Sequence, residues 1–351
     1  MACAMASPKM VLTVIFLSGI ICLTGCDSPP EPIEKKPSPE VSAAQKILFV
    51  NSYHKGYPWS DAILASVIEH LELRPQAEDL WENDVYRLKI FYMDSKRKPD
   101  ELSKETAARQ AMQLIATWQP ELMITSDDNA VKYLAVPLLK EKKLPIVFTG
   151  VNWDAADYHL PREMATGMIE VQLIDQIIAN LQPYAKGNNV CFLKGADFST
   201  NKEADAFERH FGLSLKRLFV SDFTEWSQAY RQAQQDCSML LVGNPVSIEG
   251  WDDAAARALT EVETLVPTGA WDDWMQGYVL LTFSTVPDEQ GEWAATAARE
   301  ILAGESPAEI EVTRNRKAKI YRNMAMAKQL GIVFPMEFIR RSLAVEQGVS
   351  Q

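Results

Sequence analysis

The chain contains 351 residues and carries a formal net charge of −12 at pH 7. This acidic balance argues against nucleic acid and against an anionic membrane surface as binding partners. The part from Lys46 to Gln351 is long enough for two domains of ordinary size, and no segment within it is apolar enough to cross a bilayer.

Residues 1–26 predict a lipoprotein signal peptide. Lys9 supplies a positive charge, and the apolar segment 11–23 that follows is too short for a spanning helix. The segment closes on "LTGC", in which the small residues before Cys26 resemble a bacterial lipobox, whose cysteine is acylated. An ordinary secretory signal with an incidental cysteine is the alternative. Asp27 resembles the signal that retains lipoproteins of enteric bacteria on the inner membrane, so we expect a periplasmic protein, lipid-anchored on the outer leaflet of the cytoplasmic membrane.

Residues 27–45 are rich in proline and nearly free of bulky apolar side chains, which predicts a disordered tether. After the tether, apolar runs and helical periodicity alternate. The expected elements are strand 46–50, helix 59–73, strand 86–93, helix 101–118, strand 121–126, helix 129–140 and strand 144–150. Such alternation predicts an α/β fold with a parallel sheet covered by helices on both faces.

The second half repeats this organisation. Its expected elements are helix 172–184, strand 189–195, helix 201–212 ending at a glycine cap, and strands 215–222, 238–244 and 263–272. The two halves also share details, because Thr149-Gly150 followed by Trp153-Asp154 matches Thr268-Gly269 followed by Trp271-Asp272. The period is much longer than that of a solenoid repeat, so the sequence predicts two similar doubly wound lobes.

The last part of the chain carries a more specific resemblance. A strand running into "VPDEQG", a helix ending in "ILAG", and a closing "LGIVFP" follow one another in this order. Together with the lipobox and "SYHKGYPW" at residues 52–59, they resemble the ABC-transporter substrate-binding protein family, which has the type I periplasmic-binding-protein fold. The resemblance implies three crossings between lobes, expected near residues 155, 280 and 308. Lobe 1 would then comprise 46–155 plus 280–307, and lobe 2 would comprise 156–279 plus 308–351.

The same resemblance implies that the protein captures a small molecule between its lobes and delivers it to an inner-membrane ABC permease. A ligand-sensing receptor of the same fold, which signals to a membrane histidine kinase or cyclase, is the alternative. An enzyme on a doubly wound scaffold is a weaker alternative. In either main case the membrane is reached only through the N-terminal lipid.

Catalytic patterns are missing from the sequence. Its four histidines do not stand in a zinc-binding spacing, and neither a nucleophile elbow nor a P-loop nor a dinucleotide fingerprint occurs. Acidic pairs at 127–128, 252–253 and 272–273 could do acid and base chemistry, but helix capping is the simpler interpretation. We therefore expect a binding protein that is not an enzyme and needs no cofactor or metal.

Polar and aromatic side chains gather where the predicted strands end, which is the edge at which open α/β sheets bind ligands. The candidate ligand-binding residues are Ser52, Tyr53, His54, Tyr57, Trp59, Asp94, Ser126, Asp127, Asp128, Thr149, Gly150, Asn152, Lys194, Asn244, Trp271 and Asp272. Aromatic rings stack on flat or cationic ligands and carboxylates pair with ammonium groups, so an amino acid, an amine, a nucleoside-like compound or a sugar is expected.

Several of these residues have a structural alternative. Trp59 could be a hydrophobic staple on its helix, His54 a hydrogen-bonding group of its loop, and Trp271 a packing residue of the fold. Cys191 and Cys237 remain in the folded body after the signal peptide is removed. They could form a disulfide in an oxidising periplasm or stay as two buried thiols.

Overall fold

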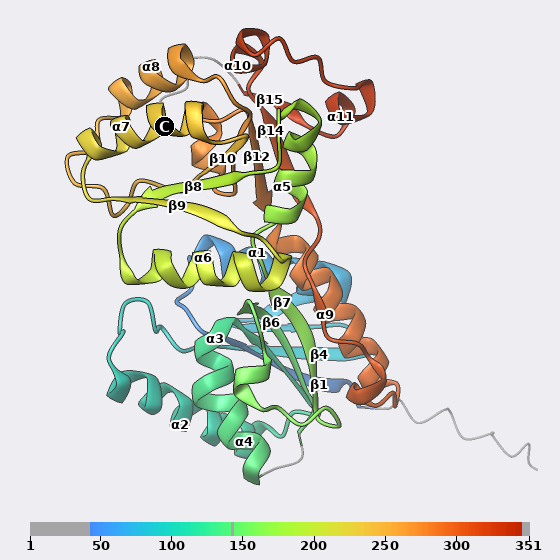
Figure 1. Ribbon diagram of the computed structural model, residues 1–351. Coiled ribbons are helices and arrows are strands. Elements are labelled where there is room, and N and C mark those ends of the chain that lie inside the picture. Colours follow the sequence, from blue (N-terminus) through green and yellow to red (C-terminus); the bar gives the residue numbers. More distant parts are fainter. Residues whose placement is uncertain (1–42, 142–143, 346–351) are drawn as a thin grey trace, which may run out of the picture. The chain divides into compact units, whose positions relative to one another are not determined.

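Two sheets organise the computed structural model, which describes residues 43–141 and 144–345 (Figure 1). The predicted signal peptide, the lipidation of Cys26 and nearly all of the tether lie outside these described residues. Within them, no helix is long and apolar enough to span a membrane. The predicted α/β class is confirmed, because both sheets are mostly parallel and strands alternate with helices.

The first sheet has the strand order β13-β7-β6-β5-β1-β4-β3-β2. Its strands are β1 (Gln45–Asn51), β2 (Arg74–Ala77), β3 (Leu80–Glu82), β4 (Tyr86–Tyr92), β5 (Leu122–Ser126), β6 (Ile146–Asn152), β7 (Ala165–Glu170) and β13 (Thr313–Arg314). All pairings are parallel except β2 with β3 and β3 with β4, and the hairpin of β2 and β3 was not predicted from the sequence. The first strand starts at Gln45, the last residue assigned to the tether.

Both faces of the first sheet are covered, which explains why β1 is an uninterrupted apolar run. Ile47 and Phe49 pack with α1 (Pro58–His70) and α9 (Pro287–Leu302), whereas Leu48 and Val50 point to the opposite face. The helices on that opposite face are α2 (Glu101–Trp118), α3 (Asp127–Ala130) and α4 (Val136–Glu141), the last two joined by a π-helical turn (Val131–Ala135).

The second sheet has the strand order β15-β14-β12-β11-β10-β8-β9. Its strands are β8 (Val190–Gly195), β9 (Leu215–Val220), β10 (Met239–Val242), β11 (Thr268–Ala270), β12 (Leu281–Thr285), β14 (Ala318–Arg322) and β15 (Leu343–Ala344). Only the pairing of β12 with β14 is antiparallel. The strand expected over 263–272 is therefore limited to three residues at its centre.

Helices also cover both faces of the second sheet. One core contains α5 (Ile174–Leu181), α6 (Phe198–Phe211), α10 (Met324–Gln329) and α11 (Met336–Arg340), and the other contains α7 (Phe223–Asp236) and α8 (Asp253–Glu263). The predicted glycine cap is present, because Gly212 ends α6 with a φ of 64°. The helices α7 and α8 were not predicted from the sequence. Short 3-10 turns lie at Ala156–Tyr158, Gln182–Tyr184, Asp273–Gly277 and Pro307–Glu309.

A disulfide joins Cys191 on β8 to Cys237, the residue that ends α7. The two Cα atoms are 5.9 Å apart, within the range that a disulfide requires. The bond ties the second sheet to the helix that covers it, and both cysteines lie in the same buried core. The sequence left the choice between a disulfide and free thiols open, and the structure pairs them.

The chain passes between the sheets three times, and each passage lies later than the expected positions near 155, 280 and 308. It leaves β7 for α5 after Glu170, leaves β12 for α9 after Thr285, and leaves β13 for β14 after Arg314. The strands β7 and β13, expected in lobe 2, therefore belong to the first sheet, and β12, expected in lobe 1, belongs to the second. The reason is β7, an additional strand that extends the first sheet before the chain leaves it.

Candidate ligand-binding site

The carboxyl ends of the parallel strands bring most of the predicted residues of the first half to one edge of the first sheet. In the strand register Asn51 is opposite Ser126, which is opposite Thr149. Asn152 at the end of β6 is opposite Glu170 at the end of β7. Side chains that follow these positions can therefore converge on one ligand.

Asp127 is the most enclosed carboxylate at this edge. It starts α3 with a left-handed backbone (φ 68°), and its exposed fraction is only 3%. The hydroxyl of Ser126 donates to its Oδ2 at 2.8 Å. Burial nevertheless raises the pKa of Asp127 to about 7, because a buried carboxylate loses hydration that one hydroxyl does not replace.

Glu170 supplies a second carboxylate that the sequence analysis missed. It ends β7, and burial raises its pKa to about 8, with smaller contributions from Asp127 and Asp128. The sequence carries only a weak signal for it, a carboxylate that ends the short segment "ATGMIE". Three acidic groups thus share one edge, and burial raises the pKa values of two of them toward neutral pH.

Asp128 is the third carboxylate and is fixed by neighbouring donors. The side-chain amide of Asn152 and the hydroxyl of Tyr158 each donate to it at 2.6 Å. Burial and the bond to Asp128 both raise the pKa of Tyr158, so the phenol keeps its proton. Tyr158 was not predicted, because it lies in a 3-10 turn away from any strand end.

We call the sheet edge that carries Asp127, Asp128 and Glu170 the acidic edge. Tyr53 and Tyr57 form an aromatic pair beside it. Their ring centroids are 4.6 Å apart in an edge-to-face arrangement, and the ammonium of Lys96 lies 4.7 Å from the Tyr53 centroid. Burial, followed by the charge of Asp127, raises the pKa of Tyr53, which therefore stays a hydrogen-bond donor. The pair provides the aromatic surface expected from residues 52–59, and Lys96 is a further residue missed in the sequence.

The predicted hydroxyl residues of this edge hold the backbone together. Ser52 and Thr149 are completely buried. Ser52 donates to the carbonyl oxygen of Ser126 at 2.5 Å and accepts from the amide of Ala130 at 2.8 Å. Thr149 donates to the Thr125 carbonyl oxygen at 3.1 Å. Both hydroxyls thus bind backbone groups of the protein, and these bonds hold the neighbouring strand ends in place.

Three other predicted residues have partners away from the acidic edge. Asp94 binds Arg97 at 2.7 Å, which holds the pKa of Asp94 below its ordinary value, and His54 lies 3.9 Å from the same carboxylate. Trp59 packs from α1 against the core of the first sheet. These contacts leave His54 Nδ1 and Trp59 Nε1 buried without a hydrogen-bond partner among the described residues.

The second sheet presents a separate polar cluster at the ends of β8, β10 and β11. Lys194 binds Glu203, a residue of α6 that was not predicted, at 2.5 Å. The amide of Asn244 donates to Asp272 Oδ2 at 2.9 Å. Burial raises the pKa of Asp272, and the charge of Lys194 opposes that rise. The predicted residues of the second half are therefore brought together, with Glu203 as an additional member.

Trp271 belongs to the core and does not form an open wall. Its exposed fraction is 6%, and its ring packs edge-on against Phe207 and Phe192 at centroid distances of 5.2 and 5.5 Å. Trp153, its counterpart in the repeat, also packs against Phe207 at 5.4 Å. The shared Trp-Asp pattern thus places both indoles in the same aromatic cluster.

The site has the chemistry of a binding edge for a cationic group. Asp127, Asp128 and Glu170 offer carboxylate oxygens, and the tyrosines offer donors and ring surfaces. Among the described residues, no group of histidine, cysteine or acidic side chains is arranged to hold a metal ion.

Comparison with known proteins identifies the family. The model of the family "ABC transporter substrate binding protein" matches residues 77–345. The ligand-free, open structure of a substrate-binding protein with adhesive properties from Clostridium difficile is 16% identical, with a TM-score of 0.63 over 87% of this chain and 100% of that one. A domain from Streptococcus pneumoniae in complex with L-Trp is also 16% identical, with a TM-score of 0.51 over 86% of this chain and 100% of that one.

These two structures share the fold that was predicted from the sequence, that of type I periplasmic binding proteins. No curated protein matches the sequence. The family binds a small ligand for an ABC transporter, which confirms the expectations of a small-molecule ligand, of an ABC transporter as partner and of a protein that is not an enzyme. The chain belongs to the ABC transporter substrate-binding protein family.

Proposed function

We propose that the protein captures a small molecule with an ammonium group, such as an amino acid or amine, at the acidic edge of the first sheet. The observation that carries the proposal is the burial of Asp127 and Glu170, whose pKa values rise to about 7 and about 8. The positive charge of Lys96 lowers the pKa of Asp127, but by less than burial raises it. A bound ammonium would supply the missing positive charge and allow both carboxylates to ionise.

The rest of the ligand would be enclosed by the remaining predicted groups. Tyr53 and Tyr57 provide aromatic surface, and Asn152 and Asp128 provide hydrogen-bonding groups. Contacts from Lys194, Asn244 and Asp272 on the second sheet would favour a closed state through their added affinity. The L-Trp that the Streptococcus pneumoniae structure holds supports an amino acid as the first class to test.

Delivery to an inner-membrane ABC permease follows from this capture. The sequence supports a periplasmic protein held on the outer leaflet of the cytoplasmic membrane by lipid on Cys26, within the pattern "LTGC". Mass spectrometry of the mature N-terminus tests the anchor, because an acylated Cys26 must then be the first residue. An unmodified terminus elsewhere would exclude it.

Thermal-shift measurements test the ligand class. We expect stabilisation by L-tryptophan or another amino acid, and none by the matched compound in which the amino group is replaced by hydrogen. A ligand at 100 times its dissociation constant adds about 2.7 kcal/mol to the free energy of unfolding. Asp127→Asn should abolish the shift, whereas Asp84→Asn, at an exposed position between β3 and β4, should preserve it. Equal shifts with and without the amino group would refute the proposal.

A further inference from the structure

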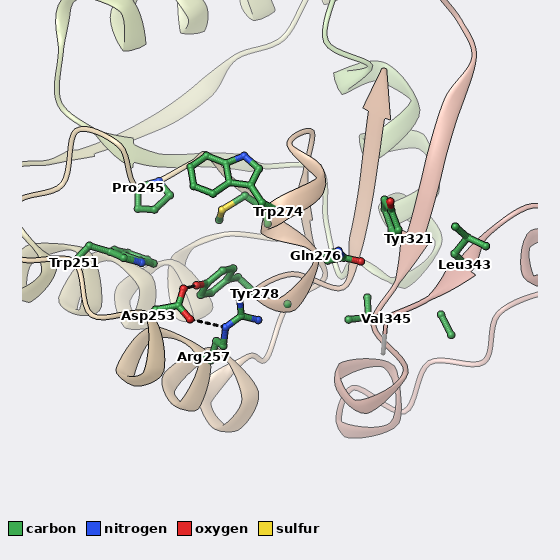
Figure 2. A pocket seen from close by; sticks show the side chains of 13 residues that line it. Pro245, Trp251, Asp253, Arg257, Trp274, Gln276, Tyr278, Tyr321, Leu343 and Val345 are labelled. Carbon is green, nitrogen blue, oxygen red and sulfur yellow. Dashed lines mark hydrogen bonds and ion pairs between the residues drawn. The ribbon is translucent and has the colours of Figure 1, made fainter. Parts of the chain in front are cut away.

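A cavity lies away from the acidic edge, in the part of the chain that forms the second sheet. Its volume is about 700 Å³, which is within the range of small-molecule sites. It is bounded by the start of α8, the 3-10 turn Asp273–Gly277 and the strands β14 and β15 (Figure 2). We call it the aromatic pocket, and its lining includes Trp251, Trp274, Tyr278, Tyr321, Arg257 and Gln276.

Four aromatic rings contribute to the walls of the aromatic pocket. Trp251 and Tyr278 pack edge-on at a centroid distance of 5.8 Å, and Tyr321 on β14 is nearly buried. Trp274 is different, because 48% of its surface is exposed even though the ring lies at the rim of the cavity. An indole that stays in water at the mouth of an aromatic cavity is a surface that a flat ligand would cover favourably.

The polar groups that the aromatic pocket offers to a ligand are donors. Its carboxylate, that of Asp253, already has partners within the protein. Asp253 accepts from Arg257 Nε at 2.8 Å and from the hydroxyl of Tyr278. The guanidinium carbon of Arg257 lies 4.5 Å from the Tyr278 ring centroid. Because the bond to Asp253 uses Nε, the terminal nitrogens of Arg257 are left as donors for an incoming group.

Gly277 makes room for the guanidinium of Arg257, and Gln276 adds a second donor to the pocket. A side-chain carbon at position 277 would collide with Arg257 Nη1, so Gly277 leaves the room that the guanidinium fills. Figure 2 shows the amide of Gln276 between Tyr278 and Tyr321, and no hydrogen bond occupies this amide within the described residues. The cavity thus combines flat apolar walls with fixed, unused donors.

We infer that the aromatic pocket binds a planar aromatic carboxylate. The rings of Trp274 and Tyr278 would hold the flat body of the ligand, and Arg257 with Gln276 would bind its carboxylate, which guanidinium groups recognise with two parallel hydrogen bonds. This charge preference is opposite to that of the acidic edge around Asp127. The chain would therefore carry two sites that differ in the ligands they accept.

Isothermal titration calorimetry of the purified protein with indole-3-acetate tests the inference, with indole-3-acetamide and tryptamine as the neutral and cationic counterparts. We expect saturable binding of the acid at one site, and at least tenfold weaker binding of the amide. Tryptamine, whose ammonium group suits the acidic edge, is compared in Asp127→Asn, where it should bind at least tenfold more weakly than the acid. Trp274→Ala and Arg257→Gln should each weaken the acid at least tenfold. Val262→Ala, an exposed change on the helix that carries Arg257, should leave its affinity unchanged.

The location is tested separately from the chemistry. Asp127→Asn should not alter binding of the acid, and loss of binding in that variant would assign the acid to the edge of the first sheet and overturn the inference. If Arg257→Gln fails to fold, Gly277→Ala displaces the guanidinium while keeping the charge, and it should weaken the acid in the same way. Equal affinities for acid and amide, or no saturable binding, as would follow if the cavity were a protein contact, would also overturn it.

Discussion

Gly150 lies directly against the buried carboxylate of Asp127, because a side-chain carbon at position 150 would stand 3.4 Å from Asp127 Oδ1. Gly150 also has a φ of 64°, a left-handed backbone that residues with a side chain adopt at a cost. Glycine is therefore favoured at this position of β6 by its backbone conformation, whereas a side-chain carbon would make an ordinary van der Waals contact with Asp127.

Replacement of Gly150 by alanine should separate backbone strain from site chemistry. Gly212 has the same φ of 64°, but a side-chain carbon there would meet nothing within 4 Å. Both Gly150→Ala and Gly212→Ala should lower the free energy of unfolding by about 1–2 kcal/mol, measured by urea denaturation. Only Gly150→Ala should also weaken ligand binding in calorimetry, and an equal effect of both changes on affinity would contradict the proposed site.

The stability of the ligand-free protein should depend on pH through Asp127. Its folded pKa of about 7 lies above the value of about 3.9 for an unfolded chain, so the folded state binds the proton more tightly. The free energy of unfolding must then fall as the pH rises from about 4 to about 7, because the folded state alone has to release a proton into a buried site. Glu170 extends this fall to about pH 8.

Denaturation curves at several pH values check this sign. Asp127→Asn should reduce the loss of stability between pH 5 and pH 8, by about 1.4 kcal/mol for each unit of raised pKa that it removes. Asp84→Asn serves as the exposed control. Wild type and Asp127→Asn with parallel pH profiles would show that Asp127 titrates normally.

Trp271 should contribute mainly to stability. Its ring is buried against Phe192 and Phe207, so Trp271→Ala should lower the free energy of unfolding by about 3–5 kcal/mol, and Trp271→Phe by less. Tyr53→Ala, by contrast, should weaken ligand binding at least tenfold, which corresponds to about 1.4 kcal/mol. Unfolding of the two alanine variants by urea, followed by calorimetry below the transition, separates the effects. If Trp271→Ala kept full stability, the core assignment would be wrong.

The positions of Trp271 and Ser52 explain why the site was only partly predictable. Both follow an apolar strand, which correctly places them at the carboxyl edge of a sheet, but strand position does not tell whether a side chain points to the ligand or into the core. Trp271 meets Phe207 of α6, and Ser52 meets Ser126 of β5, residues distant in the sequence. These contacts depend on tertiary packing, which a local pattern does not contain.

The limits of the fold prediction have a similar physical origin. Long apolar runs such as β1, and α2 with its regular periodicity, were found at nearly their observed bounds. Glu170 was missed with its strand β7, since "ATGMIE" contains only two bulky apolar residues and resembles a loop. The crossing positions shifted with it, because a lobe boundary depends on which sheet accepts the last strand.

Removal of the disulfide should destabilise the second sheet and α7. Cys191 and Cys237 are 46 residues apart. A cross-link that closes a loop of this length lowers the entropy of the unfolded chain, which raises the free energy of unfolding by about 4 kcal/mol. A variant with both cysteines changed to alanine should unfold at lower urea concentration than the oxidised wild type. Reductant should lower the midpoint of the wild type toward that of the variant and leave the variant unchanged. A wild type insensitive to reductant under unfolding conditions would mean that the thiols are free.

Asn315 joins two of the passages between the sheets. It is 1% exposed, its Oδ1 accepts from the amide of Val171 at 2.7 Å, and its Nδ2 donates to the Val171 carbonyl oxygen at 3.1 Å. Val171 follows β7, whereas Asn315 follows β13. The side chain of Asn315 therefore joins two of the segments that pass between the sheets. Any motion of the lobes about these passages must carry this pair as a unit or break it.

Asn315→Ala should loosen the connection, because it leaves the amide and carbonyl of Val171 without partners at a cost of about 1–3 kcal/mol each. Hydrogen exchange is the direct measurement, and the Val171 amide should exchange at least tenfold faster in the variant. Asn201→Ala, an exposed change on α6, should leave that amide unaffected. If Val171 kept its protection in Asn315→Ala, other contacts would hold the passages together, and Asn315 would not be the residue that couples them.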